Sequence, residues 1–379
     1  MSFVEEEEEC EFNKENFFYS FPAFNLFDDS NRNSDEKRPP LLLKLIPLPY
    51  TSEDFEQMPV GARGWYASAI LSAMMITSFS NIGRVDVKAQ YGNFKNDFVH
   101  VDCLNSNRSE VFMGRDLLSE DLRRACTGVN DVLPNRTGKS TVFLELGSGA
   151  IGLSGMAMAW IVAQYQFNFR RNQDSMNSRN KILLTDYDHN CLLQLERNVA
   201  GVRQTFRKYF SETVMKDQEL GNNGNNGQGV IPDIDVAHLD WNEFDKDQSP
   251  VLSDATSNED INHNLITFVC GAALVYTEDT AACVDQVAKI LRLNPKCVVW
   301  IVQWPRDGWF NVFQQDLLST RFKDDGLQIE VRKFGPSSSP DLFSVEVQQL
   351  AQKLMPVSMQ PEPQINIKEF RAVRITNKL

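Results

Sequence analysis

The sequence is poor in the residues that build metal centres and disulfide frameworks. It has 7 cysteines, none of them in a Cys-x-x-Cys pair, and 4 histidines that lie far apart. Zinc sites usually show closely spaced pairs of these residues, so we expect no metal site. Unpaired thiols are typical of reducing compartments, and we therefore expect a cytoplasmic or nuclear protein.

Basic residues are scarce relative to acidic ones. There are 38 Lys and Arg residues against 51 Asp and Glu residues, which gives a formal net charge of −13. A protein that binds DNA or RNA needs a basic surface, so we expect no direct nucleic-acid partner. The negative charge is compatible with a basic protein partner, which it would attract. We expect the chain itself to be a monomer.

Long apolar segments are also missing. The longest apolar run, residues 65–79, is interrupted by Ser and Thr and is too short to span a bilayer. We interpret it as a core helix and expect no membrane partner. The N-terminus has no basic segment followed by an apolar one, so we expect no signal peptide.

Residues 141–155 form the most informative segment that is present. A β-branched, apolar run ends in Glu145, a glycine-rich turn follows, and an apolar run rich in Ala and Met comes after it. This pattern predicts a strand, a tight loop and a helix. Glycines let a ligand approach the backbone closely, and the helix offers unpaired N–H groups to it. The segment therefore indicates a site for a nucleotide-like cofactor.

Two cofactors compete for this loop. The spacing of Gly147, Gly149 and Gly152 fits the G-x-G-x-x-G pattern of dinucleotide sites, which leaves a nicotinamide-dependent oxidoreductase open. That pattern calls for an acidic residue about 20 positions further on, whereas Asp186 lies 39 residues beyond Gly147. Glu145 would repel a pyrophosphate but attract a cationic group. S-adenosylmethionine has a cationic amino-acid end, and Asp186 can accept both of its ribose hydroxyls.

Two later segments are expected to end at the same edge. Residues 234–240 alternate and are β-branched, and they end in Asp240 and Trp241. Asp240 can accept the adenine amino group while nearby apolar groups cover the ring. A fourth strand is expected at 265–275. Ligands of open α/β sheets bind at the carboxyl ends of the strands, so these segments predict one common site.

In this order the segments resemble the class I, seven-stranded S-adenosylmethionine-dependent methyltransferases. More narrowly, they are similar to methyltransferase family 16, many members of which methylate lysine in proteins. The resemblance covers roughly residues 110–334, with a last strand at 370–377. It rests on Glu145 with the glycine loop to Gly155, on residues 184–187, on Leu192, Leu195 and Asn198, on residues 239–241, and on residues 271–276.

The resemblance implies which residues do what. It places S-adenosylmethionine against Glu145, Gly147, Gly149, Asp186, Asp240, Trp241 and Ala272. We expect Tyr276 to line the methyl-transfer channel and Glu278 or Asp279 to orient an incoming ammonium. The expected activity is methylation of a protein, with lysine as the acceptor.

The chain departs from the family pattern at Ala273. The family usually has Asp at this position of its Asp-x-x-Tyr motif, whereas Tyr276 is retained. The missing carboxylate favours an alternative function, that of a catalytically silent adaptor that binds the cofactor.

The expected architecture is an α/β, Rossmann-like, seven-stranded methyltransferase sheet with an antiparallel last strand, preceded by an N-terminal accessory segment. We expect a mostly disordered acidic tail at 1–58 with one docked segment at 41–46, an accessory element at 59–135, and the methyltransferase domain at 136–379. Within the accessory element we expect strands at 84–90 and 98–103.

Overall fold

The structure of the protein is a computed structural model. The described residues are 18–22, 40–46, 65–89, 117–127, 141–170, 180–219, 231–241, 265–274, 280–303, 312–313, 315, 326–333, 345–354 and 370–377.

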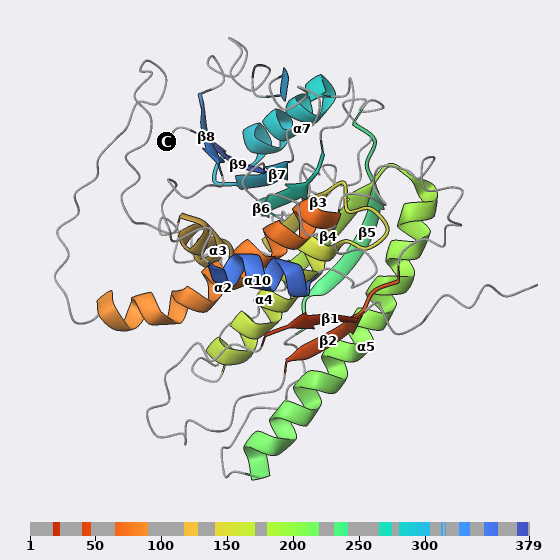
Figure 1. Ribbon diagram of the computed structural model, residues 1–379, viewed down its shortest axis with the longest axis vertical. Helices are drawn as coiled ribbons and strands as arrows, with labels where there is room; N and C mark the ends of the chain where they lie inside the picture. Colours follow the sequence, from red (N-terminus) through yellow and green to blue (C-terminus); the bar gives the residue numbers. More distant parts are fainter. Residues whose placement is uncertain are drawn as a thin grey trace, which may run out of the picture.

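A seven-stranded sheet forms the centre of the described structure (Figure 1). Its order is β5-β4-β3-β6-β7-β9-β8, and the strands are β3 (Thr141–Leu146), β4 (Asn180–Asp186), β5 (Asp233–His238), β6 (Leu265–Ala272), β7 (Val298–Gln303), β8 (Leu327–Lys333) and β9 (Arg371–Asn377). The first five strands run parallel, and β9 is antiparallel to both β7 and β8. The expected α/β, seven-stranded fold with an antiparallel last strand is confirmed.

The central strands form because their sequences are apolar on both faces. Every residue of β3 and β7 is buried, as is typical of parallel strands covered by helices on both sides. The larger core lies on one face, under α2 (Trp65–Ala89), α3 (Leu117–Thr127), α4 (Leu153–Arg170), α5 (His189–Glu219) and α10 (Val345–Lys353). The smaller core lies on the other face, against α7 (Thr280–Leu293).

A small hairpin from the N-terminal region packs on the larger core. Strands β1 (Phe18–Phe21) and β2 (Leu41–Lys44) pair antiparallel, and Figure 1 shows them beside α5. Tyr19 and Phe21 of β1 are buried, as are alternate leucines from Leu41 to Leu45. The segment expected to dock at 41–46 does so, and residues 18–22 dock with it.

Some predicted elements differ from those observed. The strand predicted at 84–90 is wrong, because α2 continues as a helix to Ala89. The alternation of Val and Asp there has the period of a strand, but it extends a helix that is already formed upstream. The strand predicted at 98–103 lies outside the described residues.

None of the helices in the described part of the chain is long and apolar enough to cross a membrane.

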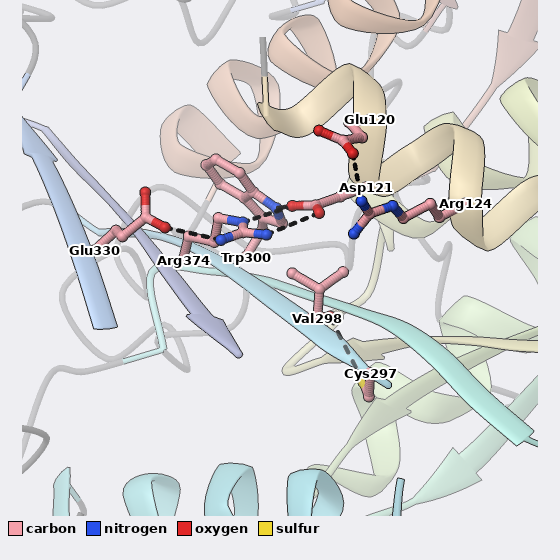
Figure 2. Close-up of polar contacts among 8 residues, drawn as sticks. All are labelled: Glu120, Asp121, Arg124, Cys297, Val298, Trp300, Glu330 and Arg374. Atoms are coloured by element: carbon pink, nitrogen blue, oxygen red, sulfur yellow. Dashed lines mark hydrogen bonds and ion pairs between the residues drawn. The ribbon is translucent and has the colours of Figure 1, made fainter. Parts of the chain in front are cut away.

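A buried polar network fastens α3 to the antiparallel edge of the sheet (Figure 2). Trp300, Arg374 and Glu330 lie side by side on β7, β9 and β8. The carboxylate of Asp121 on α3 accepts hydrogen bonds from Trp300 Nε1 (2.9 Å), Arg374 Nε (2.7 Å) and a terminal nitrogen of Arg374 (3.0 Å). Glu330 takes the remaining side of the guanidinium at 2.8 Å. The Asp121 carboxylate and the Arg374 guanidinium therefore both have charged hydrogen-bond partners.

We predict that Asp121→Ala lowers the free energy of unfolding by about 3–5 kcal/mol, because it leaves Arg374 buried with too few acceptors. The matched control is Glu120→Ala on the same helix. Glu120 pairs with the exposed Arg124, so its removal costs about 1 kcal/mol or less. Urea denaturation of the two variants measures both values, and equal small losses would contradict a stabilising role for the network.

Candidate functional site

The carboxyl ends of β3, β4, β5 and β6 meet at one edge of the sheet, where the predicted site lies. The strands are parallel and in register, so that Glu145 of β3 lies beside Leu184 of β4 and Cys270 of β6. The glycine loop leaves β3 at this edge and leads into α4 (Figure 1). The site is therefore built from chain segments that are far apart in the sequence.

Three glycines give the loop its shape. Gly147, Gly149 and Gly152 have φ values of 61°, 59° and 61°, in the left-handed region that favours glycine. A Cβ atom on Gly147 would also lie 2.8 Å from Leu274 Cδ2. The loop thus needs glycine for its backbone conformation and, at Gly147, for the close approach of a neighbouring side chain.

The carboxyl end of β4 holds the loop in place. Ser148 N donates to Thr185 O at 2.7 Å, and Thr185 N donates back to Ser148 Oγ at 3.1 Å. The hydroxyl of Thr185 donates to Glu145 O at 2.7 Å. Gly149 N donates to Asp186 Oδ2 at 2.8 Å. These four hydrogen bonds fix the loop before any ligand binds.

Asp186 is an acceptor of backbone N–H groups in this structure. Its second oxygen, Oδ1, accepts from Asp188 N at 3.0 Å, and the residue is only 4% exposed. Burial raises the pKa of its carboxyl, although the N–H groups of Asp188 and Gly149 act in the opposite direction. Each oxygen keeps a lone pair, so binding of ribose hydroxyls stays a prediction.

Glu145 lies beneath the loop, against the first turn of α4. It is 2% exposed, and its Oε2 has no hydrogen-bond partner among the described residues. A Cβ atom on Gly155 would lie 2.7 Å from this oxygen. Burial raises the pKa of Glu145 to about 7, while donors of Ser148, Gly155 and Ser154 act to lower it. The site therefore contains a carboxyl group whose charge depends on what lies near it.

Asp240 and Trp241 reach the same edge. Leu239 N donates to Asp186 O at 2.9 Å, which brings the end of β5 against the end of β4. Asp240 is half-buried, and the ring of Trp241 approaches the loop, since a Cβ atom on Gly147 would lie 3.9 Å from it. The structure thus places Trp241 beside the loop, with Asp240 directly before it in the chain, and the contacts of both with adenine stay a prediction.

The end of β6 has an unusual backbone. Ala273 has a φ of 56°, which is rare for a residue other than glycine, and its N–H donates to Val302 O at 2.8 Å. The turn directs Leu274 over Gly271 and Gly147, where a Cβ atom would be 2.6 Å and 2.8 Å from its methyl groups. Ala272 is buried just before this turn. Tyr276 and Glu278 lie outside the described residues.

Several residues of the site were not predicted from the sequence. Thr185 binds the loop through both its backbone and its hydroxyl. Asp188 caps α5, because its Oδ1 accepts from Cys191 N at 2.9 Å. An Asp directly before a helix is a recognisable signal for such a cap. Leu274 has no local signal, because its role depends on the turn at Ala273.

Comparison with known proteins gives distant similarities to solved structures, with TM-scores near 0.3. No protein-family model and no curated protein sequence matches it. Among solved structures, a TehB-like SAM-dependent methyltransferase from Corynebacterium glutamicum is 11% identical, with 69% of this chain and 96% of that chain covered and a TM-score of 0.32. The METTL16 MTase domain is 9% identical over 69% of this chain and 67% of that one, with a TM-score of 0.30.

A third solved structure, precorrin-6y C5,15-methyltransferase from Geobacter metallireducens, is 10% identical over 73% of this chain and 96% of that one, with a TM-score of 0.29. At such values these likenesses carry nothing about substrate. The strand order, the antiparallel last strand and the glycine loop at the carboxyl edge are those of the expected α/β, Rossmann-like, seven-stranded sheet.

We predict that Gly155→Ala destabilises the protein by about 1–3 kcal/mol, because the new Cβ would lie 2.0 Å from Leu184 Cδ2 in a filled core. Gly201→Ala is the matched control. Gly201 also lies in a helix, but nothing lies within 4 Å of its Cβ position. This control should gain roughly 0.5–1 kcal/mol from helix propensity. Thermal and urea denaturation measure both changes, and a neutral Gly155→Ala would show that α4 does not pack this closely on β4.

Glu145→Gln should change how stability depends on pH. The folded pKa of about 7 lies above the ordinary 4.5, so the folded protein binds more protons between these values and wild-type stability falls as pH rises through them. The neutral variant lacks this loss. Its stability relative to wild type should therefore rise by roughly 3 kcal/mol between pH 4.5 and 8. Urea denaturation across this range measures the difference, and a constant difference would refute the raised pKa.

Proposed function

We propose that this protein is an S-adenosylmethionine-dependent methyltransferase that methylates lysine in another protein. The observation that carries the proposal is the preformed glycine loop, held by Thr185 and Asp186 above the buried carboxyl group of Glu145. When bound, S-adenosylmethionine supplies a methyl group that its sulfonium already activates. The residues of the chain then have to bind it, orient it and admit the acceptor.

The charge of the site fits a cationic ligand better than an anionic one. Glu145 has a buried oxygen next to the loop that has no hydrogen-bond partner among the described residues, and a nearby cation would favour its ionised form. A pyrophosphate would instead meet a carboxylate in a site with little water to screen it. This contrast supports S-adenosylmethionine over a nicotinamide dinucleotide.

The other contacts are assigned by the groups that each residue presents. Asp186 keeps lone pairs for the ribose hydroxyls, and Asp240 is the acceptor proposed for the adenine amino group. Gly147 and Gly149 are assigned to the cofactor through the backbone of the loop, whose left-handed conformation they allow. Trp241 provides an apolar wall at the same place, next to the turn that follows Ala272.

Lysine is the proposed acceptor because transfer of a methyl group to an amine needs little from the protein beyond positioning and deprotonation of the amine. An ammonium has no lone pair, so the amine must lose a proton before it attacks the methyl carbon. We assign Tyr276 to the lining of the transfer channel and Glu278 to the orientation of the incoming amine. The net charge of −13 favours basic segments of partner proteins as substrates.

Calorimetric titration with S-adenosylhomocysteine tests the cofactor assignment. Wild type should bind, and Asp186→Asn should weaken binding by about 10–100-fold, because it removes a charged acceptor worth roughly 1.5–3 kcal/mol. Asp235→Asn is the matched control. It removes a half-exposed carboxylate on β5 that pairs with Lys181 and Arg203, and it should leave affinity unchanged. Binding of NAD in place of S-adenosylhomocysteine would overturn the assignment.

Transfer of labelled methyl groups to cell-extract proteins tests the reaction. Label should appear in protein, survive nuclease treatment and be recovered as methyl-lysine after hydrolysis. Tyr276→Phe should reduce the rate without abolishing cofactor binding. Cofactor binding with no acceptor in any extract would indicate the silent adaptor instead, and label in nucleic acid would refute a protein substrate.

A further inference from the structure

The N-terminal hairpin is fastened at the end of each of its strands to a different helix. After β1, Pro22 O accepts a hydrogen bond from Trp160 Nε1 of α4 at 2.9 Å. After β2, Ile46 is held by Asn198 of α5. Both helices begin at the edge of the sheet where the glycine loop lies. The hairpin is thus joined to the helices that frame the candidate site.

The side chain of Asn198 connects the hairpin directly to the loop. Its Nδ2 donates to Ile46 O and to Ala150 O, both at 2.9 Å, and its Oδ1 accepts from Ile46 N at 2.9 Å. The residue is 3% exposed. Both N–H bonds of the amide are used, and a flipped amide would place its oxygen against two carbonyl oxygens. The amide therefore has one orientation, which its hydrogen bonds to Ile46 and to Ala150 determine together.

Ala150 is the third of three successive loop residues that are held from outside the loop. Ser148 is bound by Thr185, and Gly149 is bound by Asp186, both at the end of β4. Ala150 is bound by Asn198, which reaches it from α5. Of these three attachments, only the last is shared with the N-terminal hairpin. Asn198 therefore contacts both the docked hairpin and the loop.

We propose that the N-terminal hairpin sets the affinity of the cofactor site, and that Asn198 is the positioning residue that couples them. The inference rests on the proposed function, because it concerns binding at that same site. Docking of Ile46 orients the Asn198 amide, and the amide holds Ala150 in the ligand-binding conformation of the loop. Coupling between two binding events is reciprocal, so the ligand must in turn stabilise docking of residues 41–46.

Amide hydrogen exchange and calorimetry on the full chain test the coupling, with S-adenosylhomocysteine as the probe. In wild type, the probe should slow exchange in residues 41–46. Asn198→Ala should lose this protection and bind the probe about tenfold more weakly, as expected for the loss of one loop hydrogen bond.

Asn294→Ala is the matched control. Asn294 is equally buried and also bridges backbone groups, since it binds Ile290 O at 3.0 Å and accepts from Ile266 N at 3.1 Å. It lies at the opposite end of the sheet, where β6 begins. It should lose comparable stability but keep wild-type affinity and wild-type protection of residues 41–46.

If Asn198→Ala does not fold, Ile46→Pro tests the same link. It removes the N–H that donates to Asn198 Oδ1 and leaves Asn198 itself unchanged, at a half-exposed residue. Lower probe affinity is again expected. Wild-type affinity in the folded Asn198 variant, or no protection of residues 41–46 in wild type that binds the probe, would overturn the coupling alone. No binding by wild type would overturn the proposed function, and the coupling with it.

Discussion

The attachment of the glycine loop to the end of β4 is the constraint on which the rest of the site depends. A chain that leaves a buried parallel strand and enters a helix within a few residues exposes backbone N–H groups that need acceptors. Thr185 and Asp186 provide them through short hydrogen bonds to Ser148 and Gly149. Because β4 is in register with β3, the carboxyl ends of the two strands lie side by side, and these acceptors are next to the loop that follows β3.

The position of Glu145 follows from this arrangement, and burial of its carboxyl group costs free energy. Its side chain points under the first turn of α4, where Gly152 and Gly155 leave space for it. A buried carboxylate without a cationic partner is unfavourable, which is why its pKa is raised to about 7. A protein selected only for stability would place a neutral residue here. Under the proposed function, a ligand that brings positive charge would offset this cost.

The sequence was sufficient for the elements with strong local signals. The glycine pattern predicted the loop, and the runs ending in Glu145 and Asp240 predicted two strands of the sheet, which are β3 and β5. The sequence could not predict those features of the structure that long-range contacts determine. Asn198 was one residue in a helical pattern, yet its amide joins segments 152 and 48 residues away. The end of α2 was misread because local alternation gave no information about the helix that precedes it.

The turn at Ala273 shows how a local cost is compensated by packing across the site. A left-handed conformation costs a residue with a Cβ atom about 1 kcal/mol, and glycine would avoid this. The conformation persists because the N–H of Ala273 is bound to β7 and because Leu274 fills the space over Gly147 and Gly271. The family pattern usually has a carboxylate at this position, where this chain has only a methyl group. The turn therefore brings an apolar side chain to the loop and contributes no charge, so that Glu145 and Asp186 supply the buried carboxylates next to it.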